Sequence, residues 1–78
     1  MKKFDIQYAV KDKHFNLNIR AKTDAAIKGV YYSLYMHGVW VANIYKTSME
    51  QYKALSYTKD FLQHELDAIG QQIDMANW

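Results

Sequence analysis

Apolar and polar residues alternate with a period of two along the first part of the chain. The alternating apolar positions are Phe4, Ile6, Tyr8 and Val10 and, after a polar break at residues 11–13, Phe15, Leu17, Ile19 and Ala21. This period is typical of β-strands that bury one face. The pattern predicts a β-hairpin, and the type of its turn stays open because no Asn-Gly or Asp-Gly pair is present.

From Thr23 the apolar positions recur with the period of a helix. The stripe at i, i+3, i+4 and i+7 consists of Ile27, Val30, Tyr31 and Leu34. Thr23 is a suitable N-cap, and Gly38 is a natural stop after the last turn. The sequence therefore predicts a core-facing helix. A third strand is expected at residues 39–45, where β-branched and aromatic residues are frequent.

The last part of the chain has the pattern of a long amphipathic helix. The predicted helix runs from about Met49 to about Ala76, with Thr47 and Glu50 as a capping box. Unbroken, it would be ~42 Å long, whereas a compact domain of this size has a diameter near ~30 Å. The helix would then project from the domain, and a second copy of the chain would cover it. The alternative is a break near residues 56–58 that folds both halves onto one sheet.

Together these elements predict one α+β domain that spans residues 1–78. The expected order is β-β-α-β-α, with a three-stranded, mainly antiparallel sheet, helices on one face and a long C-terminal helix. The predicted core consists of Phe4, Ile6, Tyr8, Phe15, Leu17, Ile19, Ile27, Val30, Tyr31 and Leu34. A chain of 78 residues builds only a modest core, and without cysteine no disulfide supports it.

Composition indicates a folded protein and predicts where it resides. Half of the residues are hydrophobic, which is too apolar for a disordered chain. No apolar run approaches the ~20 residues needed to span a membrane, and the first ten residues do not resemble a signal peptide. With cysteine also absent, the cytoplasm is the expected location.

The residues that usually carry catalysis are sparse. The chain has no cysteine and no glycine-rich phosphate loop, and its three histidines lie in three different predicted elements. Asp60 with His64, or His64 with Asp67, has the spacing of two metal ligands on one helix face, but a solvated ion pair explains the same spacing. We therefore expect a protein that is not an enzyme and that uses no metal or cofactor.

Positive charge gathers in the N-terminal part of the chain. Residues 1–28 carry seven Lys or Arg against three Asp, whereas residues 29–78 carry three Lys against five acidic residues. The residues that could contact nucleic acid are Lys11, Lys13, Asn16, Asn18, Arg20 and Lys22. Alternation sends the hairpin's aromatic residues to the core side, so this face lacks stacking groups. Nucleic-acid binding is therefore the second hypothesis.

The stretch GVYYSLYMHGVW holds more aromatic side chains than one helix stripe can bury. Tyr and Trp are frequent at interface hot spots, so the leading hypothesis is a small protein-binding inhibitor or adaptor. A source in phages or other mobile elements is a compositional analogy. The expected partner-binding residues are Tyr32, Met36, Trp40, Phe61 and Trp78. A homodimer is expected through the C-terminal helix, with an interface formed by Leu62, Leu66, Ile69 and Ile73.

Overall fold

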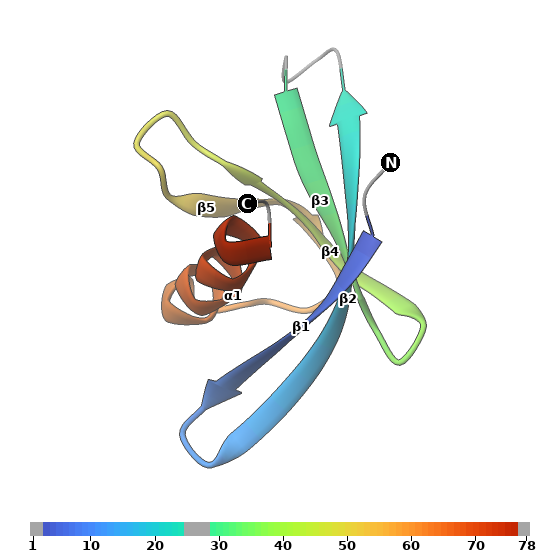
Figure 1. Ribbon diagram of the computed structural model, residues 1–78, viewed down its shortest axis with the longest axis vertical. Helices are drawn as coiled ribbons and strands as arrows, with labels where there is room; N and C mark the ends of the chain where they lie inside the picture. The colour runs from blue at the N-terminus through green and yellow to red at the C-terminus, as the bar shows by residue number, and fades with distance from the viewer. Residues whose placement is uncertain (1–2, 25–28, 77–78) are drawn as a thin grey trace.

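The structure, a computed structural model, describes residues 3–24 and 29–76. Its elements are β1 (Lys3–Val10), β2 (Lys13–Asp24), β3 (Gly29–Met36), β4 (Val39–Lys46), β5 (Tyr52–Tyr57) and α1 (Gln63–Ala76). The strands form one antiparallel sheet in the order β1-β2-β3-β4-β5, so each strand pairs with its neighbour in the sequence. The sheet is twisted, and α1 lies across one of its faces (Figure 1).

The predicted three-stranded sheet with several helices is wrong. The hairpin of β1 and β2 and the strand at residues 39–45 are present as predicted, but β3 occupies most of the first predicted helix. The segment predicted as a helix also satisfies a period of two, since Tyr32 and Leu34 alternate with Tyr31, Ser33 and Tyr35. Aromatic side chains favour a strand at such a site, because they pack well against neighbours on the pleated surface.

The predicted long helix from Met49 is also wrong. The chain forms β5 first and begins α1 only at Gln63, so the helix has 14 residues. The predicted capping box at Thr47 and Glu50 lies instead in the turn between β4 and β5, where the Glu50 N–H donates to the Thr47 carbonyl at 2.9 Å. At the true helix start, the Leu62 N–H donates to Glu65 Oε1 at 3.0 Å, which is one half of a capping box.

Two-residue turns connect β1 to β2 and β3 to β4. Val10 pairs with Lys13, so residues 11 and 12 form the first turn, with Lys11 at a φ of 57°. Met36 pairs with Val39 across His37 and Gly38, whose φ angles are 52° and 78°. Positive φ at both central residues is the signature of a type I′ turn, which matches the twist of the paired strands. Gly38 therefore ends a strand rather than a helix.

The core lies between the sheet and α1. Its buried hydrophobic residues are Ile6, Tyr8, Leu17, Ile19, Leu34, Val41, Ala42, Ile44, Tyr52, Phe61, Leu66, Ile69 and Ile73. Of the predicted core, five residues are buried here, and Phe4 and Phe15 pack against the cluster. Val30 is 45 % exposed, Tyr31 points to the other face of the sheet, and Ile27 lies outside the described residues.

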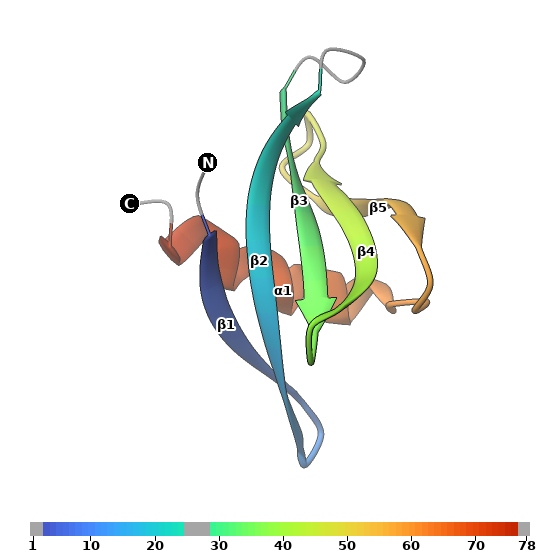
Figure 2. The same ribbon diagram turned by 90° about the vertical axis from the view of Figure 1, so that its right-hand side faces the viewer.

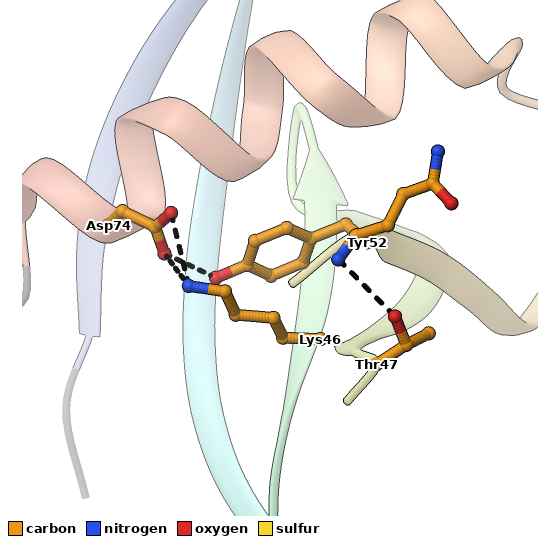
Figure 3. A network of polar contacts seen from close by, with 5 residues as sticks. Lys46, Thr47, Tyr52 and Asp74 are labelled. Atoms are coloured by element: carbon orange, nitrogen blue, oxygen red, sulfur yellow. Dashed lines mark hydrogen bonds and ion pairs between the residues drawn. The ribbon is translucent and has the colours of Figure 1, made fainter. Parts of the chain in front are cut away.

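A small polar network fastens α1 to the β4–β5 hairpin. The Tyr52 hydroxyl donates to Asp74 Oδ1 at 2.8 Å, and Lys46 Nζ lies 3.4 Å from the same carboxylate (Figure 3). Burial and the neighbouring Asp74 raise the pKa of Tyr52 well above its ordinary value. Within the described part of the chain, α1 is neither long nor apolar enough to cross a membrane.

Candidate nucleic-acid interface

Among residues 3–24 and 29–76, no helix lies on the face of the sheet opposite α1 (Figure 2). Figure 2 shows this face toward the viewer, with the strands in front and α1 behind them. We call it the open face. Its residues on β2, β3 and β4 form three rows: Lys22, Tyr31 and Tyr45; Arg20, Ser33 and Asn43; Asn18, Tyr35 and Trp40. Two aromatic rows therefore flank a polar one.

A bulge in β4 brings Trp40 onto the open face. Leu34 pairs with Ala42, but the next residue, Tyr35, pairs with Trp40, so Val41 is the extra residue of β4. The Trp40 indole Nε1–H donates to Asn43 Oδ1 at 2.9 Å. In a regular strand residues three apart point to opposite faces, so the bulge places the indole beside the polar row.

Hydrogen bonds order the middle of the open face. The Ser33 hydroxyl donates to Asn43 Oδ1 at 2.7 Å, the same oxygen that accepts from Trp40. Ser33 is only 1 % exposed, and its cross-strand neighbours are the larger residues Arg20 and Asn43. Its bond to Asn43 satisfies a hydroxyl that would otherwise be costly to bury. These hydrogen bonds thus fix the side chains of the polar row between the two aromatic rows.

Arg20 links the polar row to the aromatic residues. Its guanidinium carbon lies 4.2 Å from the centroid of the Tyr35 ring, within the range of a cation–π contact. Its Nε–H donates to Asn18 Oδ1 at 3.2 Å, and the Asn18 amide donates in turn to Asp5 Oδ1 at 3.0 Å. The open face therefore holds a guanidinium group against an aromatic ring.

The aromatic side chains of the open face are partly packed on the sheet and partly exposed. Tyr31, Tyr35, Trp40 and Tyr45 are all partly buried, so each ring packs on the sheet and leaves part of its surface to solvent. Lys3, opposite Arg20 on β1, and Lys22, opposite Tyr31, add positive charge beside them. Rings of this kind offer π-surface, and the cations beside them suit an anionic partner.

A hollow of about 590 Å³ adjoins the aromatic rows on the side of β1. Its polar lining comes from Asp5, Gln7, Asn16, Asn18 and His37. The first four alternate on the open face of β1 and β2, and His37 lies in the turn after β3. The hollow therefore presents carboxylate, amide and imidazole groups next to the row that contains Tyr35.

The structure divides the predicted nucleic-acid residues into two groups. Asn16, Asn18, Arg20 and Lys22 lie on the open face as predicted. Lys11 and Lys13 line a different pocket, near the start of α1 and beside His64. The aromatic residues of the hairpin lie on the core side as predicted, but β3 and β4 supply other aromatic side chains to the same face of the sheet as Arg20 and Lys22.

The predicted partner-binding residues do not form one surface. Trp40 belongs to the open face, whereas Tyr32 and Met36 pack against the core on the helix side. Phe61 is buried at 7 % exposure, and Trp78 lies outside the described residues.

The residues predicted as a dimer interface lie mainly in the chain's own core. Leu66, Ile69 and Ile73 are at most 4 % exposed, and only Leu62 of the four is exposed. A helix of 14 residues is ~21 Å long and fits within the 28 Å width of the molecule. The projecting helix that motivated a homodimer is absent from the described residues, and dimerisation stays a prediction without that support.

Sequence reasoning missed five residues of the open face, namely Tyr31, Ser33, Tyr35, Asn43 and Tyr45. A signal was present, since Tyr31, Ser33 and Tyr35 keep a period of two that continues the alternation of the hairpin. Comparison with protein-family models, with curated proteins and with solved structures finds no match to this chain.

Proposed function

We propose that the protein binds single-stranded nucleic acid on the open face of its sheet. The observation that carries the proposal is the juxtaposition of two aromatic rows with Arg20 and Lys22 on a face that no helix covers. Aromatic side chains stack on bases, while the cations contact phosphates. The nucleic-acid hypothesis thereby moves ahead of the protein-binding one.

The spacing of the aromatic rows favours a single strand over a duplex. The two aromatic rows are four positions apart along β3, where they are marked by Tyr31 and Tyr35. At ~3.4 Å per residue the two rings are ~14 Å apart, with the polar row midway. Stacked bases in a duplex follow one another every 3.4 Å and offer no free face to the rings. An unpaired strand can splay its bases onto both rows.

Electrostatics supply the second part of the affinity. Lys3, Arg20 and Lys22 gather on neighbouring strands, and three phosphate contacts predict a slope of log K against log salt of ~−2 for a single strand. Asp5 opposes them with a single negative charge, so these four side chains together carry three positive charges against one negative charge. The net charge of these side chains is therefore positive, which suits a polyanion such as nucleic acid.

The direct test is fluorescence anisotropy with labelled single-stranded RNA and DNA 12-mers and with a duplex of the same sequence. The parent protein should bind the single strands more tightly than the duplex. Tyr35→Ala should weaken binding by about 5- to 150-fold, the loss expected for one stacked base. Arg20→Gln should weaken binding and flatten its salt dependence.

Two control variants make the same chemical changes away from the open face. Tyr57→Ala removes a tyrosine that is 54 % exposed on β5, and Lys13→Gln removes an exposed cation near the start of α1. Both should bind like the parent protein. Equal losses for Tyr35→Ala and Tyr57→Ala would contradict the proposal, as would tight binding that prefers the duplex.

A protein partner is the second candidate, favoured by the position of β5 at the edge of the sheet. Leu55 is 44 % exposed and Tyr57 54 % exposed on this edge strand. An extended apolar peptide could add a strand there, since unpaired backbone groups at an edge accept such partners. In that case Leu55→Lys would abolish capture of the partner, while Tyr35→Ala would leave it unchanged. An inhibitor or adaptor role would rest on this surface.

The groups on the open face stack, donate and accept, which is the chemistry of binding. We therefore propose a non-catalytic role, and a cytoplasmic location stays a prediction from the cysteine content.

A further inference from the structure

The hollow beside the aromatic rows differs from them in chemistry. Its lining is rich in groups that form directional hydrogen bonds, with Gln7 and Asn16 opposite one another on β1 and β2. Stacking rows accept any base, because every base has a π-face. Hydrogen bonds to a base edge distinguish one base from another. A polar hollow that adjoins a stacking row is therefore suited to reading one base.

A hydrogen bond orients the Asp5 carboxylate in the hollow. Its Oδ1 accepts from the Asn18 amide at 3.0 Å, and Asn18 Oδ1 accepts from Arg20 at 3.2 Å. Arg20 is held in turn against the Tyr35 ring. Asn18 thus acts as a positioning residue for the Asp5 carboxylate. It also links this carboxylate to Arg20, whose guanidinium stacks on the Tyr35 ring.

A carboxylate on an otherwise cationic surface needs a ligand that offers hydrogen-bond donors. Guanine carries two adjacent donors on its Watson–Crick edge, N1–H and N2–H, whose separation matches the two oxygens of a carboxylate. Cytosine and adenine each offer a single amino group on that edge, and thymine and uracil offer one ring N–H between two acceptors. The carboxylate therefore favours guanine over the other bases.

We propose that the hollow lined by Asp5, Gln7 and Asn16 binds an unpaired guanine base, with the Asp5 carboxylate accepting its two edge donors. The inference rests on the proposed single-strand binding and gives it a base preference. The phosphates that flank the guanosine lie toward Arg20 and Lys22, while a neighbouring base stacks on Tyr35.

The test uses nonamers of thymidine with one central G, A, C or T, titrated into the whole protein by fluorescence anisotropy. The G nonamer should bind at least about fivefold more tightly than the other three. Asp5→Asn should abolish this preference while binding of the all-T nonamer becomes tighter, because a negative charge leaves a surface that binds phosphates. Loss of the preference for G together with tighter binding of the all-T nonamer separates base reading from a general charge effect, which would tighten the G and all-T nonamers equally.

Asp12→Asn is the matched control, since it removes the same charge from the turn of the hairpin, where Asp12 lines the pocket near α1. It should keep the preference for G. Equal affinity for all four nonamers would overturn the guanine site and leave single-strand binding standing. Tighter binding of the A or C nonamer would also overturn the site. Absence of binding to any nonamer would overturn the proposed function and this inference together. Thermal melting of each variant confirms that it remains folded.

Discussion

Tyr8 places a phenol hydroxyl inside the core, where its ring stacks on Phe15 at a centroid distance of 5.1 Å. The hydroxyl has no hydrogen-bond partner among the described residues. Burial, with a smaller contribution from Glu65, raises the pKa of Tyr8 to about 12. The folded chain therefore holds the neutral phenol, and ionisation of this group opposes folding.

We predict that Tyr8→Phe leaves stability unchanged or raises it by about 1 kcal/mol at pH 7, because it removes a buried polar group that lacks a partner. The parent protein should also lose stability as the pH rises from 10 to about 12, since only the unfolded chain releases the Tyr8 proton in that window. Urea unfolding at several pH values measures both effects.

In the same titration Tyr8→Phe should lose less stability at alkaline pH than the parent protein. Tyr57→Phe removes a hydroxyl from an exposed tyrosine and should follow the parent at every pH. A loss of more than 1 kcal/mol for Tyr8→Phe at pH 7 would show that the hydroxyl has a partner after all.

At the scale of elements, the close approach of α1 to β5 depends on Gly70. A Cβ on Gly70 would collide with the Tyr52 ring, whose Cε1 lies 2.7 Å from the ideal Cβ position. Tyr52 is 4 % exposed and bonds Asp74 one helical turn further along α1. The absent side chain thus lets the ring lie under the helix (Figure 3).

Gly70→Ala should therefore destabilise the protein by ~1–3 kcal/mol through overpacking. Helix propensity alone predicts the opposite sign, since alanine is favoured over glycine by ~1 kcal/mol within a helix. Chemical denaturation measures the difference, with Gln71→Ala as the control because Gln71 is exposed on the next position of α1. A stabilised Gly70→Ala variant would contradict the packing of Tyr52 on the helix.

Elements with a single consistent pattern could be predicted from the sequence, and ambiguous ones could not. The hairpin of β1 and β2 shows a period of two without competition, so its buried face follows from alternation. In β3 both periods fit, because Tyr31 satisfies a helical stripe and also alternates with Tyr32. The pairing of β3 with β2 and β4 decides between them, and that pairing is a tertiary interaction absent from a local pattern.

The candidate site was only half predictable for the same reason. Asn16, Asn18, Arg20 and Lys22 follow from the alternation of β2. The aromatic rows depend on β3 being a strand and on the β4 bulge that turns Trp40 to the open face. The hydrophobic periodicity of one segment predicts neither a bulge nor the order of strands in a sheet. The sequence therefore did not show that the cationic residues of β2 and the aromatic residues of β3 and β4 share one face.

At the scale of the whole molecule, α1 covers one face of a five-stranded sheet, and no helix of the described residues covers the other face (Figure 2). The core needs only the covered face, since its buried residues lie between the strands and α1. The packed aromatic residues and ordered hydrogen bonds of the open face are therefore surplus to the core. We interpret that surplus as a preformed binding surface.

The measurement that tests this account most directly is an amide NMR titration of the labelled protein with a single-stranded oligonucleotide. We predict that the largest shift changes fall on β2, β3 and β4, at residues such as Arg20, Tyr35 and Asn43, together with the Trp40 indole N–H. Amides of α1, on the far side of the sheet, should change little. Changes confined to α1 and β5, or no changes at millimolar oligonucleotide, would contradict the account.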